Sequence, residues 1–219
     1  VLEWARPCDE SKALGAEYAQ PVVFDGQIFV GLSSSSGVFV FEEKTGLQVS
    51  KFTTDASVQS PSLIVGEVLY VADTSGVVYA FDRKNQSVLW RKDTGSPIMS
   101  ELVYVDDTLI VSTVDNSVYR LSKDGGLQWR HQYEASVTRA GELSIFGGAT
   151  PTVHEDFLYV GFSDGGVQKI SLDKGEVVST IWVGEGRYPD IVSKIGIAGE
   201  KVILSGFEVS GGLSIRTPL

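Results

Sequence analysis

Short runs in which apolar and polar residues alternate fill most of the chain, and turns rich in Gly, Ser, Asp and Asn separate them. Alternation with a period of two, together with many β-branched and aromatic residues, is typical of half-buried β-strands. No segment shows the 3.6-residue period of an amphipathic helix, so we expect almost no helix. The pattern therefore predicts an all-β protein.

One apolar run, which ends in a small residue, recurs along the chain at steps of 41, 40, 49 and 44 residues. An entry strand and a turn-like pair precede each copy, and a second alternating run follows it. A third alternating run completes each of the first four units, which gives four antiparallel strands per unit. Units of about forty residues with four strands are typical of β-propeller blades. The five copies are IFVG (28–31), LYVA (69–72), LIVS (109–112), LYVG (158–161) and VILS (202–205).

We expect a single propeller domain over residues 1–219 with about five blades. The fifth unit ends before its fourth strand, whereas the N-terminal VLEWARP (1–7) matches the fourth-strand pattern VLWRKD (88–93). The N-terminal strand is therefore predicted to complete the last blade, which would remove two exposed sheet edges. The repeats are expected at about 13–55, 56–95, 96–133, 147–184 and 189–216, with 1–7 added to the last.

The ends of such a chain complement each other equally well between molecules. We expect a monomer that closes on itself, while a dimer formed by strand exchange of the termini stays open. A fragment of a larger ring is the other alternative.

Charge and cysteine content narrow the partners and the compartment. A net charge of −10 argues against nucleic acid, because phosphate backbones need a basic face. No apolar stretch approaches the length of a membrane span. Cys8 is the single cysteine, and it follows Arg6 and Pro7 instead of the small residues of a lipidation site. Any membrane association is therefore expected only through a lipid anchor outside this chain, and no leader is expected in its first residues.

The segment VVYAFDRKNQSVLWRKDTGSP (77–97) resembles the PQQ-like repeat, in which a Tyr-Ala-hydrophobic-Asp stretch, a Thr-Gly turn and a Trp recur. The resemblance implies that the fourth-strand tryptophans fasten neighbouring blades. Trp4, Trp90 and Trp129 stand at that place in this chain, and we interpret them as packing residues.

One branch of these proteins, the quinoprotein alcohol dehydrogenases, holds a quinone cofactor and Ca²⁺. This chain lacks the vicinal cysteine pair of that branch. His131 and His154, the two histidines, fall at a strand end and at a turn, away from any catalytic cluster. We therefore expect no enzyme activity, no cofactor and no metal site.

The long step in the repeat falls on SVTRAGELSIFGGATP (136–151), between the third and fourth units. This segment is similar to an insertion of the BamB family, in which apolar residues, an Arg and a Gly-Glu precede the next entry strand. The chain has one extra residue between the Arg and the Gly. In that family the insertion contacts the barrel-forming partner BamA, so the resemblance implies a BamA-like partner, with contact through its periplasmic domains.

The next inter-blade connection, GEGRYPDIVSK (184–194), resembles the acidic loop that serves the same surface in the BamB family. Asp190 stands at a matching place, and Val192 replaces a second Asp of the family. Eight blades form the family's propeller, against the five expected here. The expected partner contacts from both connections are Val137, Thr138, Arg139, Gly141, Glu142, Arg187, Tyr188 and Asp190.

Long connections on a rigid repeat scaffold are where binding residues tend to lie. An Arg flanked by apolar side chains is the composition of an interface hot spot. Alternatively, Leu143, Ile145 and Phe146 fold inward, cap the blade and leave a solvated Arg. Binding could also use strand addition at exposed blade edges.

The predicted function is a non-enzymatic scaffold that is periplasmic and outer-membrane associated. It would assist the assembly and insertion of β-barrel proteins into the outer membrane. The alternative is a periplasmic or secreted propeller that binds a small ligand or carbohydrate. A degenerate quinoprotein is the third possibility.

Overall fold

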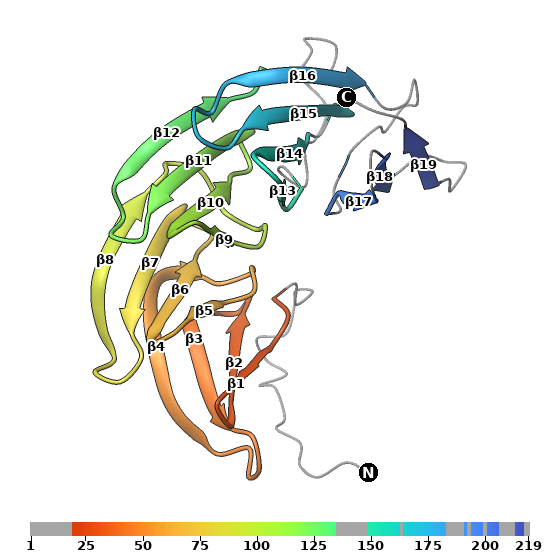
Figure 1. Ribbon diagram of the computed structural model, residues 1–219. Helices are drawn as coiled ribbons and strands as arrows, with labels where there is room; N and C mark the ends of the chain where they lie inside the picture. Colours follow the sequence, from red (N-terminus) through yellow and green to blue (C-terminus); the bar gives the residue numbers. More distant parts are fainter. Residues whose placement is uncertain are drawn as a thin grey trace. The chain divides into compact units, whose positions relative to one another are not determined.

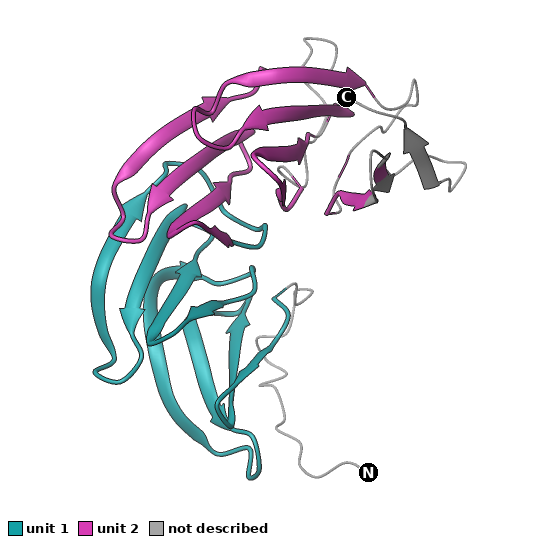
Figure 2. Cartoon of the chain, viewed as in Figure 1, with its two compact units in different colours: residues 1–102 teal, residues 103–219 magenta. Residues whose placement is uncertain are grey.

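The computed structural model describes residues 19–134, 149–162, 164–182, 191, 194–198, 201–205 and 213–216. Within these residues every regular element is a β-strand (Figure 1). The chain forms two compact units, residues 1–102 and 103–219 (Figure 2). The expectation of one domain over 1–219 stays a prediction.

The first unit holds two four-stranded antiparallel sheets in which the strands follow the order of the chain. The first sheet contains β1 (Val22–Phe24), β2 (Gln27–Leu32), β3 (Ser35–Glu42) and β4 (Gln48–Ser57). The second contains β5 (Leu63–Val65), β6 (Val68–Ala72), β7 (Val77–Asp82) and β8 (Ser87–Asp93).

The second unit holds two further four-stranded antiparallel sheets and a sheet of three described strands. The third sheet contains β9 (Val103–Val105), β10 (Thr108–Ser112), β11 (Ser117–Ser122) and β12 (Leu127–Gln132). The fourth contains β13 (Thr152–His154), β14 (Phe157–Gly161), β15 (Gly166–Ser171) and β16 (Val177–Trp182). The fifth contains β17 (Gly196–Ala198), β18 (Lys201–Ser205) and β19 (Leu213–Arg216).

The strands confirm the repeat that the alternation predicts. The five recurring apolar runs form β2, β6, β10, β14 and β18, which is the second strand of each sheet. Four sheets have the expected four strands. The fifth has an entry, a second and a third strand within the described part of the chain, as predicted. The N-terminal residues 1–7, which are expected to supply its fourth strand, lie outside that part.

Apolar side chains pack between neighbouring sheets of each unit. In the first unit, one face of the first sheet, with Phe29, Val38 and Phe52, packs on Leu69 and Phe81 of the second. The rings of Phe52 and Phe81 lie 5.3 Å apart in a tilted arrangement. Burying a side chain of this size contributes about 1.5–3 kcal/mol. Contact between sheets therefore holds the unit together, because alternation gives each strand two usable faces.

A tryptophan fastens the third sheet to the fourth. Trp129 of β12 donates from Nε1 to the main-chain oxygen of Leu172, at 2.9 Å. The buried Arg120 of β11 donates to the same oxygen, at 2.6 Å, and to Thr108. The predicted packing role is confirmed at Trp129. In the second sheet the ring of Trp90 lies 5.9 Å from that of Tyr70, and Trp4 lies outside the described residues.

A bulge recurs at one place in the four complete sheets, between the third and fourth strands. In the third sheet Arg120 pairs with Trp129 and Leu121 pairs with Leu127, which leaves Gln128 without a partner position. A β-bulge of this kind bends the strand and increases its twist. The matching extra residues in the other sheets are Val49, Leu89 and Val178.

Candidate functional site

The candidate site is the end of the fourth sheet at which β14 turns into β15. The connection from β12 enters the sheet at this end, and the connection from β16 leaves it there. All eight predicted partner contacts lie in 135–148 and 183–190, outside the described residues. The described part of the chain does include the residues at which these two connections begin and end.

The first connection begins at a buried tyrosine. The ring of Tyr133 stacks on Phe162 with centroids 3.9 Å apart and planes 6° from parallel. Its hydroxyl donates to the carboxylate of Asp164, with 2.9 Å to each oxygen. Asp164 also accepts the main-chain N–H of Gly166, at 3.0 Å. Burial, and then the hydrogen bond to Asp164, raise the pKa of Tyr133 above its ordinary value, so the phenol stays a neutral donor.

Glycine is required beside this pair. A Cβ on Gly166 would lie 2.3 Å from the hydroxyl oxygen of Tyr133, a distance that real Cβ atoms do not show. The small residue thus lets the tyrosine reach the carboxylate.

Both connections end on the same turn. Ala149, at the end of the first connection, donates its N–H to the carbonyl of Gly161, at 3.2 Å. Ile191, which follows the second connection, donates its N–H to the carbonyl of Phe162, at 3.3 Å. The buried Ile191 side chain packs so closely on Gly161 that a Cβ there would lie 2.3 Å from its Cγ2. The β14–β15 turn therefore anchors one end of each connection, and Tyr133 anchors the other end of the first.

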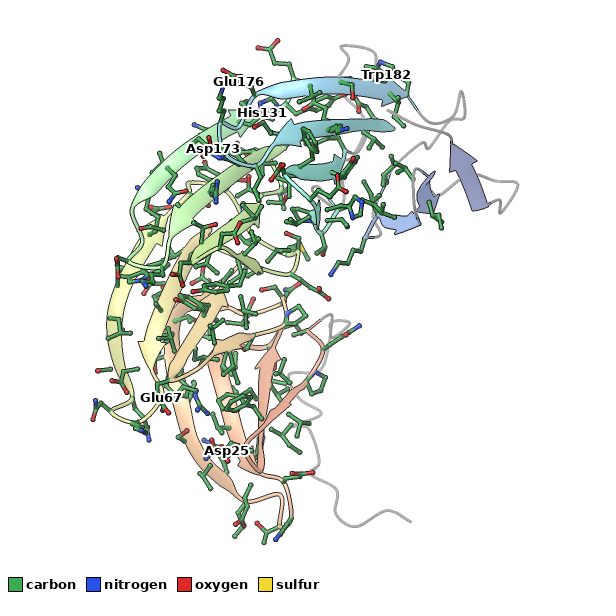
Figure 3. The ribbon with its side chains drawn as sticks, viewed as in Figure 1. Asp25, Glu67, His131, Asp173, Glu176 and Trp182 are labelled. Atoms are coloured by element: carbon green, nitrogen blue, oxygen red, sulfur yellow. The ribbon has the colours of Figure 1, made fainter. Side chains whose placement is uncertain are left out.

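Trp182 is the residue of this end that the sequence analysis did not select. It is the last residue of β16, pairs with Gly166 and has 54% of its side chain exposed. Figure 3 shows it at the end of β16 from which the second connection departs, with Glu176 near the other end. Alignment of the fourth strands could have found it, because the other sheets carry Thr53, Asp93 and Gln132 at this position.

The two histidines occupy structural positions. His131 of β12 forms a hydrogen bond, at 2.7 Å, with Gln168 of β15 in the next sheet. His154 ends β13 and pairs with Phe157. Across the described residues, no three His, Cys, Asp or Glu side chains gather closely enough to hold a metal ion. The same residues contain no helix of the length and apolarity that a bilayer crossing needs.

Comparison with solved structures shows the fold. BamB from Moraxella catarrhalis is 17% identical with a TM-score of 0.71, and the match covers 98% of this chain and 62% of that one. The quinohemoprotein alcohol dehydrogenase from Comamonas testosteroni is 14% identical with a TM-score of 0.68, over 92% of this chain and 43% of that one. The computationally designed Ika8 protein is 12% identical with a TM-score of 0.67, over 90% and 57%.

The chain thus spans about three fifths of the length of the Moraxella BamB. The predicted all-β propeller of four-stranded antiparallel blades is confirmed by this likeness and by the sheets themselves. Because an enzyme shares the fold, the fold alone does not assign an activity.

A search of curated protein sequences found no match. The family model described as "Outer membrane protein assembly factor BamB" matches residues 6–210. That match runs through all five sheets and through both connections at the β14–β15 turn, and the chain belongs to the BamB family.

Proposed function

We propose that this chain is a non-enzymatic scaffold in the periplasm, associated with the outer membrane, which assists the assembly of β-barrel proteins there. The observation that carries the proposal is the family match over residues 6–210. The joint anchoring of two long connections on one turn supports it, because it describes a rigid platform for a binding surface. Any lipid anchor would lie outside this chain.

The anchoring has a physical consequence for binding. A connection whose ends are held by buried contacts has fewer conformations to lose when a partner binds. Tyr133 and Ala149 hold the two ends of the first connection, and both are buried. Ile191 holds the far end of the second. Binding residues carried on such connections keep more of their contact energy as affinity.

The proposed partner is a BamA-like outer-membrane protein, bound through its periplasmic domains. The proposed contacts are those predicted from the sequence: Val137, Thr138, Arg139, Gly141, Glu142, Arg187, Tyr188 and Asp190. Arginine beside apolar side chains forms strong interface contacts, because its guanidinium donates several hydrogen bonds while its stem packs.

The quinohemoprotein alcohol dehydrogenases contribute only a likeness of fold to this proposal. Their branch carries a vicinal cysteine pair, and this chain has one cysteine. We therefore do not extend their oxidation chemistry to it.

The test is the affinity of the chain for the periplasmic domains of a BamA-like protein. We expect Arg139→Glu and Val137→Glu each to weaken binding at least tenfold, which corresponds to about 1.4 kcal/mol. The matched control is Lys174→Glu, because Lys174 is exposed on the turn between β15 and β16, at the opposite end of the fourth sheet. Unchanged affinity in both loop variants would refute the proposed site. An equal loss in the control would show that general charge, and not the site, governs binding.

A further inference from the structure

Trp182 departs from the repeat in a way that packing does not explain. The fourth strands of the other complete sheets carry Thr53, Asp93 and Gln132 at its position, and all three are exposed. A polar, solvated residue is therefore the ordinary occupant of this position. In the fourth sheet a large aromatic residue takes it and remains 54% exposed.

The side chain of Trp182 lies on a face of β16 that its neighbours leave without an apolar cluster. Ile181 packs with the buried residues between the fourth and fifth sheets. Because side chains alternate along a strand, Trp182 lies on the opposite face, together with Thr180. Thr180 interacts there with a polar residue, Gln168. Trp129, by contrast, donates its indole N–H to the next sheet and is largely covered.

The place of Trp182 in the fold connects it to the candidate site. Its pairing partner Gly166 begins β15, directly after the β14–β15 turn that anchors both connections. Most other large exposed apolar residues lie near the start of a fourth strand, around the bulges. They include Leu47, Val88, Leu127 and Val177. Trp182 is thus exposed at the end of its strand where the proposed contacts depart.

We propose that Trp182 is an anchor residue of the partner-binding surface, which inserts its indole ring into an apolar pocket of the protein bound by the two connections. This inference rests on the proposed function and adds a contact on an ordered strand. Tryptophan is enriched among the residues that dominate interface affinity, because a large ring is desolvated with little loss of side-chain entropy. An exposed aromatic residue beside a binding loop therefore fits a protein partner.

The test measures affinity for the periplasmic domains of a BamA-like protein in three variants. Trp182→Thr, which restores the residue of β4, is expected to weaken binding ten- to a hundredfold. Trp182→Phe, which keeps an aromatic ring, is expected to recover most of that loss. The matched control is Val178→Thr, on the same strand and also 54% exposed, with no expected change. All three variants are expected to keep the thermal melting temperature of the unaltered chain, since the position is exposed.

Oxidative footprinting read by mass spectrometry supplies a second measurement. We expect Trp182 to be oxidised readily in the free chain and to be protected in the complex. Unchanged affinity of Trp182→Thr, together with a loss in Arg139→Glu, would overturn this inference and leave the proposed function standing. Absence of any binding by the unaltered chain would overturn both. Saturable oligosaccharide binding that is lost in Trp182→Thr, with protein affinity unchanged, would overturn the inference in favour of a sugar site.

Discussion

Tyr133 and Asp164 form a buried pair 31 residues apart in sequence, and a related pair exists in the first unit. There the buried Asp73 accepts the main-chain N–H groups of Val77 and Ala56 and the hydroxyl of Tyr79. A buried carboxylate is tolerated only when hydrogen bonds replace its water. Each pair therefore fixes a turn at the end of a sheet and needs all of its donors.

We expect Tyr133→Phe to lower the free energy of unfolding by about 1–3 kcal/mol, because Asp164 loses a donor while the stack on Phe162 is kept. Denaturant unfolding measures the change. The control is Tyr104→Phe, which removes an exposed hydrogen bond to Asp107 of 2.8 Å in the same unit, with an expected change below about 0.5 kcal/mol. Equal losses in the two variants would contradict the role of burial.

Only part of the candidate site could be predicted from the sequence. The late repeat located the first connection, because counting residues between strands needs no structure. The stack of Tyr133 on Phe162 could not be predicted, since it joins side chains that no local pattern relates. Trp182 could have been found by aligning the fourth strands position by position.

Neighbouring strands and turns depend on close approach as much as on hydrophobic burial. The turn between β15 and β16 contains Gly175, with a φ of +70°, directly under the ring of Trp129. A Cβ on this glycine would lie 2.6 Å from Cδ2 of the indole. The third sheet therefore reaches the fourth only because this turn has no side chain at that point.

Gly175→Ala is expected to lower the free energy of unfolding more than Gly26→Ala does. Both glycines have a φ of +70°, so alanine costs about 1–2 kcal/mol of backbone strain at each. Gly26 has open space around its Cβ position, whereas Gly175 faces Trp129. Overpacking adds about 1–3 kcal/mol at Gly175. Equal unfolding free energies for the two variants would show that Trp129 moves away without cost.

The strands were predictable and the bulges were not, for one physical reason. Alternation along β6 or β14 is a local property, so each strand can be recognised by itself. The bulge at Gln128 depends on the pairing of β11 with β12, in which one residue more is used on β12. Such an insertion becomes visible only when both strands are aligned against each other.

Alkaline pH acts on both units of the chain at once, because each holds a buried tyrosine beside an aspartate. Burial raises the pKa of Tyr79 from 10.0 to about 12, and burial followed by the Asp164 hydrogen bond raises that of Tyr133. The folded state thus holds these protons more tightly than the unfolded state. The stabilisation is complete below pH 10 and is lost as pH rises toward about 12.

We therefore expect the free energy of unfolding to fall between pH 10 and about 12, in denaturant titrations at a series of pH values. Tyr79→Phe is expected to make this fall shallower, because one of the linked protons is gone. Tyrosinate absorbance should show phenols that ionise late in the folded chain. A pH dependence identical to that of the unaltered chain would contradict the assignment to Tyr79.

The bulges have a consequence for how the chain survives among other β-rich chains. An apolar edge strand is a template on which unfolded segments add and aggregate, and a bulge spoils that template by twisting it. In this chain the extra residues Val49, Leu89 and Val178 are themselves exposed and apolar. Each sheet thus places its irregularity where its edge is stickiest. A chaperone-like component that works beside unfinished barrel strands needs this protection, since an edge that captured every passing strand would clog the assembly line it serves.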